Sequence, residues 1–181
     1  MKFFLSSLQA ADWSIMHAIQ DMFSCGPADR FFSLITHLGD IGLIWILIGV
    51  VLLFFRGSRK YGLLLLIALA IGAALGPGLI KAIVQRPRPF LQEPGVELLI
   101  SAPKDTSFPS GHTLSSVSSA YIIGRANKGA GILAWVLAAV IAFSRMYVYV
   151  HFPSDVVCGA LLGLTVGALV WKIGGMWAGR H

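Results

Sequence analysis

Three short segments of this chain concentrate side chains that could bind and transfer a phosphate group. They span residues 81–89, 109–112 and 144–155, in an otherwise apolar sequence. Ionisable side chains near hydrocarbon are costly and are usually kept for function. We therefore interpret the set as suited to phosphoryl transfer through a histidine. Its members are Lys81, Arg88, Ser110, Gly111, His112, Arg145, His151 and Asp155.

The first and third segments supply permanent positive charge. Lys81 lies seven residues before Arg88, which is flanked by two prolines that stop a helix and stiffen the turn, and Arg145 opens the third segment. Guanidinium groups suit planar, bidentate contacts to phosphate. Taken singly, each of these cations could instead be an interfacial residue whose charge extends to the lipid headgroups.

The second segment, Pro109-Ser110-Gly111-His112, has the residues of a helix start. Ser110 can cap the helix, and Gly111 lets a ligand approach the backbone closely. Free amides and the helix dipole favour an anion at such a terminus. His112 would then lie beside a bound phosphate and could transfer protons. On its own, this four-residue match is more typical of a turn than of a binding site.

The third segment places His151 four residues before Asp155. Pro153 suits the first position of a helix, which would put Asp155 in the first turn. A carboxylate that accepts a hydrogen bond from one ring nitrogen leaves the other nitrogen as a nucleophile. The alternative is a helix-capping carboxylate beside an interfacial histidine.

Taken together, the three ordered segments closely resemble the motifs of the type 2 phosphatidic acid phosphatase superfamily, with every motif position matched. The resemblance implies a helical membrane phosphatase in which Lys81, Arg88 and Arg145 bind the phosphate oxygens. It also implies that Ser110 and the amide of Gly111 complete the oxyanion site.

The same resemblance assigns the catalytic steps to three residues. His151 would attack phosphorus and carry a phosphohistidine, and Asp155 would orient it. His112 would protonate the leaving group and then activate water. No cofactor or metal is expected, which agrees with the lack of an acidic cluster suited to magnesium or zinc.

Composition predicts how these residues are held. The chain has 181 residues, of which 56% are hydrophobic and 12% are charged. Such a composition favours one integral membrane domain over residues 1–181. We predict an all-α bundle over residues 29–173, because spanning helices need ~20 apolar residues. The five expected spans run over about 29–55, 61–84, 110–124, 129–148 and 153–172.

Residues 1–28 are predicted to form an amphipathic surface segment. Trp13 could anchor it among the headgroups, and its apolar face would consist of Leu5, Leu8, Ile15, Met16 and Ile19.

Residues outside the motifs receive structural interpretations. Gly159, Gly163 and Gly167 recur every four residues and predict close helix packing. The first span is expected to bend at Gly39-Asp40, and His37 to mark a helix end near the substrate entrance. Charged residues of the long loop over residues 85–108 are expected to be solvated; they are Glu93, Glu97, Lys104 and Asp105.

Five spans would leave the three motif segments on one side of the membrane. The opposite side would hold seven basic residues and no acidic residue, in the shorter loops, which marks it as cytoplasmic. We therefore expect a bacterial inner membrane protein whose site faces the periplasm or the extracellular space. The scattered basic residues form no stripe for nucleic acid, despite a net charge of +6.

The expected reaction is hydrolysis of a lipid phosphate or diphosphate that enters from the bilayer. The short chain resembles the small undecaprenyl diphosphate phosphatases. A phosphatidylglycerophosphate or phosphatidic acid phosphatase is the alternative, as is a lipid phosphotransferase using the same site. A non-catalytic channel or transporter would have less use for Asp155 behind His151. The lipid tail, the organism and the oligomeric state stay open.

Overall fold

The computed structural model describes residues 2–93 and 95–178, with side chains over 7–93 and 95–174. The regular structure in these residues is helical. The α-helices are α1 (Lys2–Phe23), α2 (Gly26–His37), α3 (Leu43–Phe54), α4 (Arg59–Ala73), α5 (Lys81–Val84), α6 (Gly111–Ala126), α7 (Lys128–Tyr147) and α8 (Pro153–Ala178). Three helical stretches of other types, at Asp40–Gly42, Ala74–Ile80 and Pro89–Leu91, interrupt or link them.

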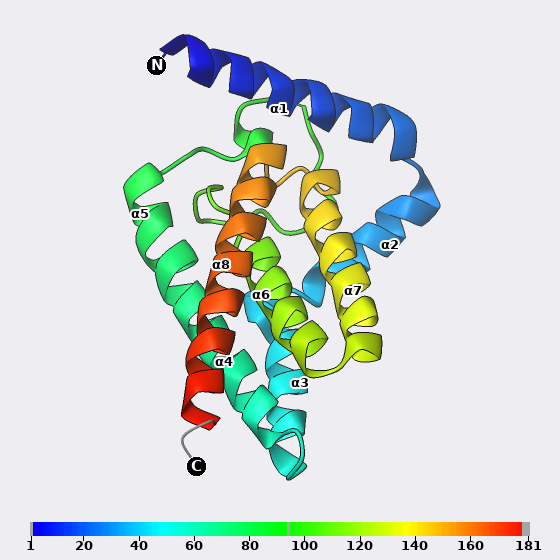
Figure 1. Cartoon of the computed structure of the whole chain (residues 1–181). Helices are drawn as coiled ribbons and strands as arrows, with labels where there is room; N and C mark the ends of the chain where they lie inside the picture. Colours follow the sequence, from blue (N-terminus) through cyan, green and yellow to red (C-terminus); the bar gives the residue numbers. More distant parts are fainter. Residues whose placement is uncertain (1, 94, 179–181) are drawn as a thin grey trace.

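Helix α6 is the centre of the bundle and packs against α4, α7 and α8, while α3 pairs with α4 (Figure 1). Its central place explains why a helix within an apolar protein can carry serines. Ser116, Ser118 and Ser119 are all buried. The indole N–H of Trp45 on α3 donates to the Ser116 hydroxyl at 2.9 Å, so one of these polar groups also joins two helices.

Three helical stretches within the described residues are long and apolar enough to cross a membrane: Arg59–Leu91, Lys128–Tyr147 and Pro153–Gly174. The pair Gly26–His37 and Asp40–Phe54 qualifies as a fourth if it is one span bent by 46°, which confirms the predicted bend at Gly39-Asp40. The remaining expected span, α6, has 16 residues. It is therefore about 24 Å long, shorter than a hydrocarbon core of about 30 Å.

The predicted glycine face of α8 is confirmed. It allows α8 to lie directly on the backbone of α6. A β-carbon at Gly159 would lie 2.6 Å from the carbonyl oxygen of Ser110, and one at Gly163 would lie 2.7 Å from that of Leu114. The first turn of α8 is thereby placed beside the start of α6, so two of the three motif segments adjoin.

Helix α4 continues into α5 through a wider, π-type turn at Ala74–Ile80 that contains Pro77. Such turns recur at functional sites because they rotate the residues that follow. Here the turn leads directly to Lys81, which begins α5 and is buried.

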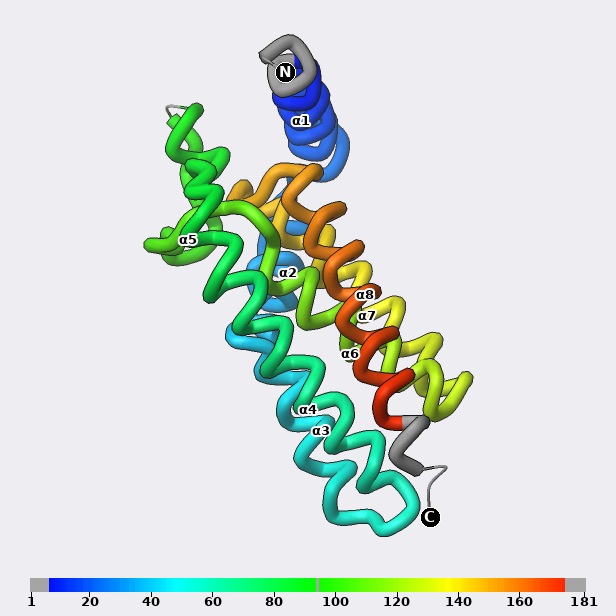
Figure 2. The backbone as a smooth tube through the Cα atoms, turned by 60° about the vertical axis from the view of Figure 1, so that its left-hand side comes forward, coloured from blue at the N-terminus to red at the C-terminus, as the bar shows by residue number. Residues whose placement is uncertain are grey.

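Helix α1 lies across the end of the bundle where α7 ends and α8 begins (Figures 1 and 2). Met16 and Ile19 are buried against the bundle, whereas Leu8 and Ile15 are exposed. The placement of this apolar face on the membrane surface stays a prediction. Helix α1 also turns a polar residue, Asp12, into the protein. The side chain of Leu5 lies outside the described residues.

Trp13, the predicted headgroup anchor, packs edge-on against Phe152 with ring centroids 5.0 Å apart. The indole therefore joins α1 to the segment that follows α7.

Candidate active site

A cavity of about 560 Å³ brings the three motif segments together. Its walls come from the bend between α2 and α3, the end of α4, the long loop and the start of α6. Both predicted imidazoles, His112 and His151, line it. The other predicted site residues that line it are Lys81, Arg88, Gly111 and Arg145.

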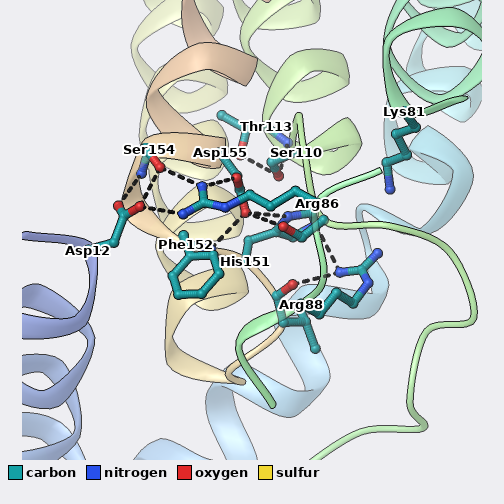
Figure 3. Close-up of polar contacts among 12 residues, drawn as sticks. Asp12, Lys81, Arg86, Arg88, Ser110, Thr113, His151, Phe152, Ser154 and Asp155 are labelled. Carbon is teal, nitrogen blue, oxygen red and sulfur yellow. Dashed lines mark hydrogen bonds and ion pairs between the residues drawn. The ribbon is translucent and has the colours of Figure 1, made fainter. Parts of the chain in front are cut away.

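His151 and Asp155 form a buried pair behind this cavity (Figure 3). The Nδ1 atom of His151 lies 3.6 Å from Oδ2 of Asp155 and has no hydrogen-bond partner among the described residues. The carboxylate itself is firmly held, because Oδ2 accepts from the Phe152 amide at 2.9 Å and from the Ser107 hydroxyl at 2.7 Å. A contact such as the 3.6 Å approach of His151 to Asp155 is often long without substrate and shortens in the reacting complex.

The other ring nitrogen of His151, Nε2, faces the cations. It lies 3.3 Å from Nη1 of Arg88, an N–H donor, so the ring accepts there and carries its proton on Nδ1 toward Asp155. Burial lowers the pKa of His151 well below its ordinary value, which keeps the imidazole neutral at neutral pH. A neutral ring whose Nε2 carries no proton is the form that can attack phosphorus.

Lys81 and Arg88 share one carboxylate, that of Asp105 in the long loop. The Lys81 ammonium donates to Oδ2 and Nη2 of Arg88 donates to Oδ1, each at 2.5 Å, and Nε of Arg88 donates to the Asp105 carbonyl at 2.8 Å. Asp105 keeps 56% of its side chain exposed, as expected for a solvated loop residue, but its pairing with two motif cations was not predicted.

The ion pairs with Lys81 and Arg88 also set the charge of Asp105. Burial would raise its pKa, but hydrogen bonds from Lys81 and Arg88 outweigh burial, and the pKa is lowered to about 2. A carboxylate thus occupies donors that the sequence assigns to a phosphate.

Arg145 enters the cavity from the last turn of α7 and is 3% exposed. Its Nη1 donates to the hydroxyl of Thr36 on α2 at 2.5 Å. Its Nε is buried and lacks a hydrogen-bond partner within the described part of the chain. A buried guanidinium with an unused donor beside a cavity is suited to receive an anion.

The start of α6 is built as the sequence predicts. The Ser110 hydroxyl caps the helix by accepting from the Thr113 amide at 3.4 Å, and the Thr113 hydroxyl donates to it at 2.9 Å. The backbone amide of Ser110 donates to the Asp155 carbonyl at 3.1 Å, which ties this helix start to α8. Ser110 is fully buried, whereas Gly111 and His112 face the cavity.

The segment after α2 also reaches the site. His37 ends α2, as expected, and its Nδ1 lies 2.7 Å from Oδ2 of Asp40. The other carboxylate oxygen, Oδ1, lies 2.9 Å from Nε2 of His112. His37, Gly39 and Asp40 line the cavity, so this segment lies beside the motif residues, and its expected place at a substrate entrance stays a prediction.

Arg86 connects Asp155 to Asp12 of helix α1 (Figure 3). Its Nη1 donates to Oδ1 of Asp155 and to the Ser154 hydroxyl, and its Nη2 donates to Oδ2 of Asp12, each at 2.7 Å. The guanidinium also lies 4.1 Å from the centre of the Phe152 ring. One arginine therefore balances two buried carboxylates.

Sequence reasoning missed four charged residues of the site. Asp40 and Asp105 lie outside the motifs, and Arg86 adjoins a motif without belonging to it. The usable signal was Asp12, an acid on the face of α1 that also carries Met16. A charged residue within the apolar face of a helix indicates that a partner of opposite charge is buried beside it.

The chain resembles known membrane phosphatases over most of its length. Residues 60–178 match the sequence model of the PAP2 superfamily. The decaprenylphosphoryl-5-phosphoribose phosphatase of Mycobacterium tuberculosis is 35% identical over 142 residues, which are 78% of this chain and 77% of that protein. The undecaprenyl-diphosphatase of Sulfolobus acidocaldarius is 36% identical over 131 residues, which are 72% of this chain and 63% of that protein.

The likeness extends to a solved structure. The crystal structure of a transmembrane PAP2-type phosphatidylglycerolphosphate phosphatase from Bacillus subtilis superposes with a TM-score of 0.76 at 29% identity. The superposition covers 94% of this chain and 87% of that one.

Proposed function

The chain belongs to the PAP2 superfamily, and from this premise we propose that it removes the terminal phosphate of undecaprenyl diphosphate. This chain is a multi-pass membrane lipid phosphatase of the metal-independent histidine kind. One observation carries the proposal. Three cations and two imidazoles from the three motif segments line one cavity, with Nε2 of His151 lying 3.3 Å from Nη1 of Arg88.

In the first half of the proposed reaction, Nε2 of His151 attacks the terminal phosphorus. The N–P bond forms as the bond from phosphorus to the bridging oxygen breaks, and His112 gives a proton to that oxygen. In the second half, a water molecule attacks the phosphohistidine, His112 takes a proton from the water, and the N–P bond breaks. Asp155 stabilises the charge that develops on His151.

The remaining motif residues hold the phosphate. Lys81, Arg88 and Arg145 would neutralise its oxygens, and the amide of Gly111 at the start of α6 would add a backbone donor. Ser110 would act through the cap that fixes this helix start. Such preorganised donors stabilise the charge of the transition state.

The choice of lipid rests on the relatives. Enzymes named for prenyl-linked substrates match this chain at 35% and 36% identity, which favours a prenyl diphosphate. Phosphatidylglycerophosphate is the second candidate, because the superposed structure is named for it. Transfer of the phosphoryl group to a second lipid would use the same first half-reaction.

The test is a panel of undecaprenyl diphosphate, phosphatidylglycerophosphate and phosphatidic acid offered to the purified protein in detergent. We expect the fastest phosphate release from undecaprenyl diphosphate. The variant His151→Ala should lose release, and His17→Ala, which removes a half-exposed histidine outside the cavity, should keep it. Faster release from phosphatidylglycerophosphate would overturn the substrate, and label in a second lipid would indicate phosphotransfer. Full activity of His151→Ala would overturn the mechanism.

We also propose that α6 is a fifth span and that the site faces outward. The loop between α3 and α4 and the link between α6 and α7, which carry basic residues, lie at the end of the bundle opposite α1 (Figure 1). The orientation can be tested with variants that carry one introduced cysteine in a protein whose two native cysteines have been replaced. In intact cells, Lys104→Cys should react with an impermeant maleimide and Gly57→Cys should not. The opposite pattern would invert the orientation.

A further inference from the structure

The carboxylate of Asp40 contacts the imidazole of His112. We infer that Asp40 is the positioning residue of His112, so that the site contains a second histidine–carboxylate pair beside His151 and Asp155. The inference rests on the proposed function, in which His112 transfers protons. No motif contains Asp40, which comes from the bend between α2 and α3.

The contact fixes which nitrogen of His112 can act. Nε2 lies 2.9 Å from Oδ1 of Asp40, and a carboxylate can only accept, so Nε2 must carry a proton. The remaining nitrogen, Nδ1, is then the atom that gives and takes protons at the substrate. During the reaction Nδ1 alternates between protonated and free, and Asp40 stabilises the imidazolium form.

Close packing indicates that the turn at Gly39 and Asp40 fits the imidazole ring of His112. A β-carbon on Gly39 would lie 2.5 Å from Cδ2 of His112, so the backbone before Asp40 lies directly against the imidazole. His37 holds the second carboxylate oxygen at 2.7 Å, which limits rotation of the Asp40 side chain.

The backbone after Asp40 is an independent observation. Ile41 has φ of 49° and Gly42 has φ of 74°, two consecutive left-handed residues. For a β-branched residue that conformation is strained, and Ile41 gains little from burial because it is 89% exposed. Strain of this kind persists where the surrounding structure needs it, and it clusters at functional sites. Here it directs Asp40 toward His112.

The test separates the two half-reactions with p-nitrophenyl phosphate. Its leaving group departs without an acid, so phosphorylation of His151 appears as a rapid burst of p-nitrophenolate, and later turnover needs His112 as a base. We expect Asp40→Asn to keep the burst rate and to lower steady-state kcat about 10- to 100-fold, because a residue that acts through His112 contributes no more than the lower end of the ~10²–10⁴-fold of general acid–base catalysis. The KM should fall together with kcat and leave kcat/KM nearly unchanged, because kcat/KM reports the phosphorylation step. Asp21→Asn, an exposed acid on α1, is the matched control and should behave like the unmodified protein.

Vanadate binding checks that the cavity survives in the variant. Unchanged vanadate affinity with a slowed steady state supports the inference. An equal loss in burst and steady state, or a loss of vanadate affinity, would assign Asp40 a structural role and overturn it. An Asp40→Asn enzyme as fast as the unmodified one would overturn it while leaving the proposed function intact. An unmodified enzyme with no activity on any phosphate in the panel would overturn both.

Discussion

Neutralising Asp105 should make the enzyme bind anions more tightly. Its carboxylate takes one donor from Lys81 and one from Arg88, the cations assigned to the substrate phosphate. A phosphate must therefore displace Asp105 before it can use both donors. The variant Asp105→Asn keeps the shape of the side chain and removes its charge.

The magnitude follows from exposure. Bonds to charged groups contribute about 1.5–3 kcal/mol when buried, and exposed ion pairs contribute about 0.2–1 kcal/mol. Since 56% of the Asp105 side chain is exposed, the lower range applies, at roughly 0.5–1 kcal/mol for each of the two contacts. A total of about 1–2 kcal/mol corresponds to about 5- to 30-fold in affinity.

The assay is inhibition by vanadate, measured as Ki from initial rates of phosphate release. We expect the Ki of Asp105→Asn to fall by that factor. Glu93→Gln changes an acid of the same loop whose partners are His17 and Tyr149, and its Ki should not change. An unchanged or higher Ki in Asp105→Asn would refute the reasoning, because Asp105 would then organise the cations instead of competing for them.

The pH dependence provides a second check on the same residue. Because the pKa of Asp105 is lowered to about 2, the ion pair is complete above the ordinary value near 3.8 and is lost only as the pH falls toward 2. The ratio of the two Ki values should therefore be constant between about pH 5 and pH 9. A ratio that changes within this window would contradict the assignment.

The remaining predictions concern stability and metal dependence. Gly163→Ala would place a β-carbon 2.7 Å from a backbone oxygen of α6, so thermal unfolding should show a loss of about 1–3 kcal/mol. Gly57→Ala, with nothing within 4 Å, should be neutral, and equal melting points would refute the packing argument. Arg86→Met should lower the free energy of unfolding by about 3–5 kcal/mol, because it leaves two buried carboxylates without a counter-ion. Adding Asp12→Asn to this variant should recover part of that loss, and additive losses of stability would contradict the network. EDTA should leave phosphate release unchanged, and loss of activity that added magnesium or zinc restores would contradict a metal-independent mechanism.

Much of the fold and the motif geometry could be predicted because it is encoded locally. Apolar runs indicate helices, Ser110 and Pro153 mark helix starts, and the glycines of α8 mark a packing face. The order and spacing of the motif residues predicted that His112 and His151 would share a site, and they line one cavity.

The residues that could not be predicted act over long distances in sequence. Asp40 meets a histidine 72 positions away, and Asp12 meets Arg86 74 positions away. Neither pairing leaves a periodic signal, because each depends on how whole helices cross. The short, serine-containing α6 also departs from an apolar pattern, since its neighbours rather than lipid surround it.

The attachment of α1 has a practical consequence for work on this protein. The sequence of the first helix is typical of a peripheral anchor, yet its Asp12 accepts from the Ser154 amide at 2.9 Å and shares the Arg86 guanidinium with Asp155. A shortened version lacking residues 2–23 would therefore lose a counter-ion as well as an anchor. Fusion partners and purification tags are better joined after α8, whose last described turns lie at the other end of the bundle from this junction (Figure 1).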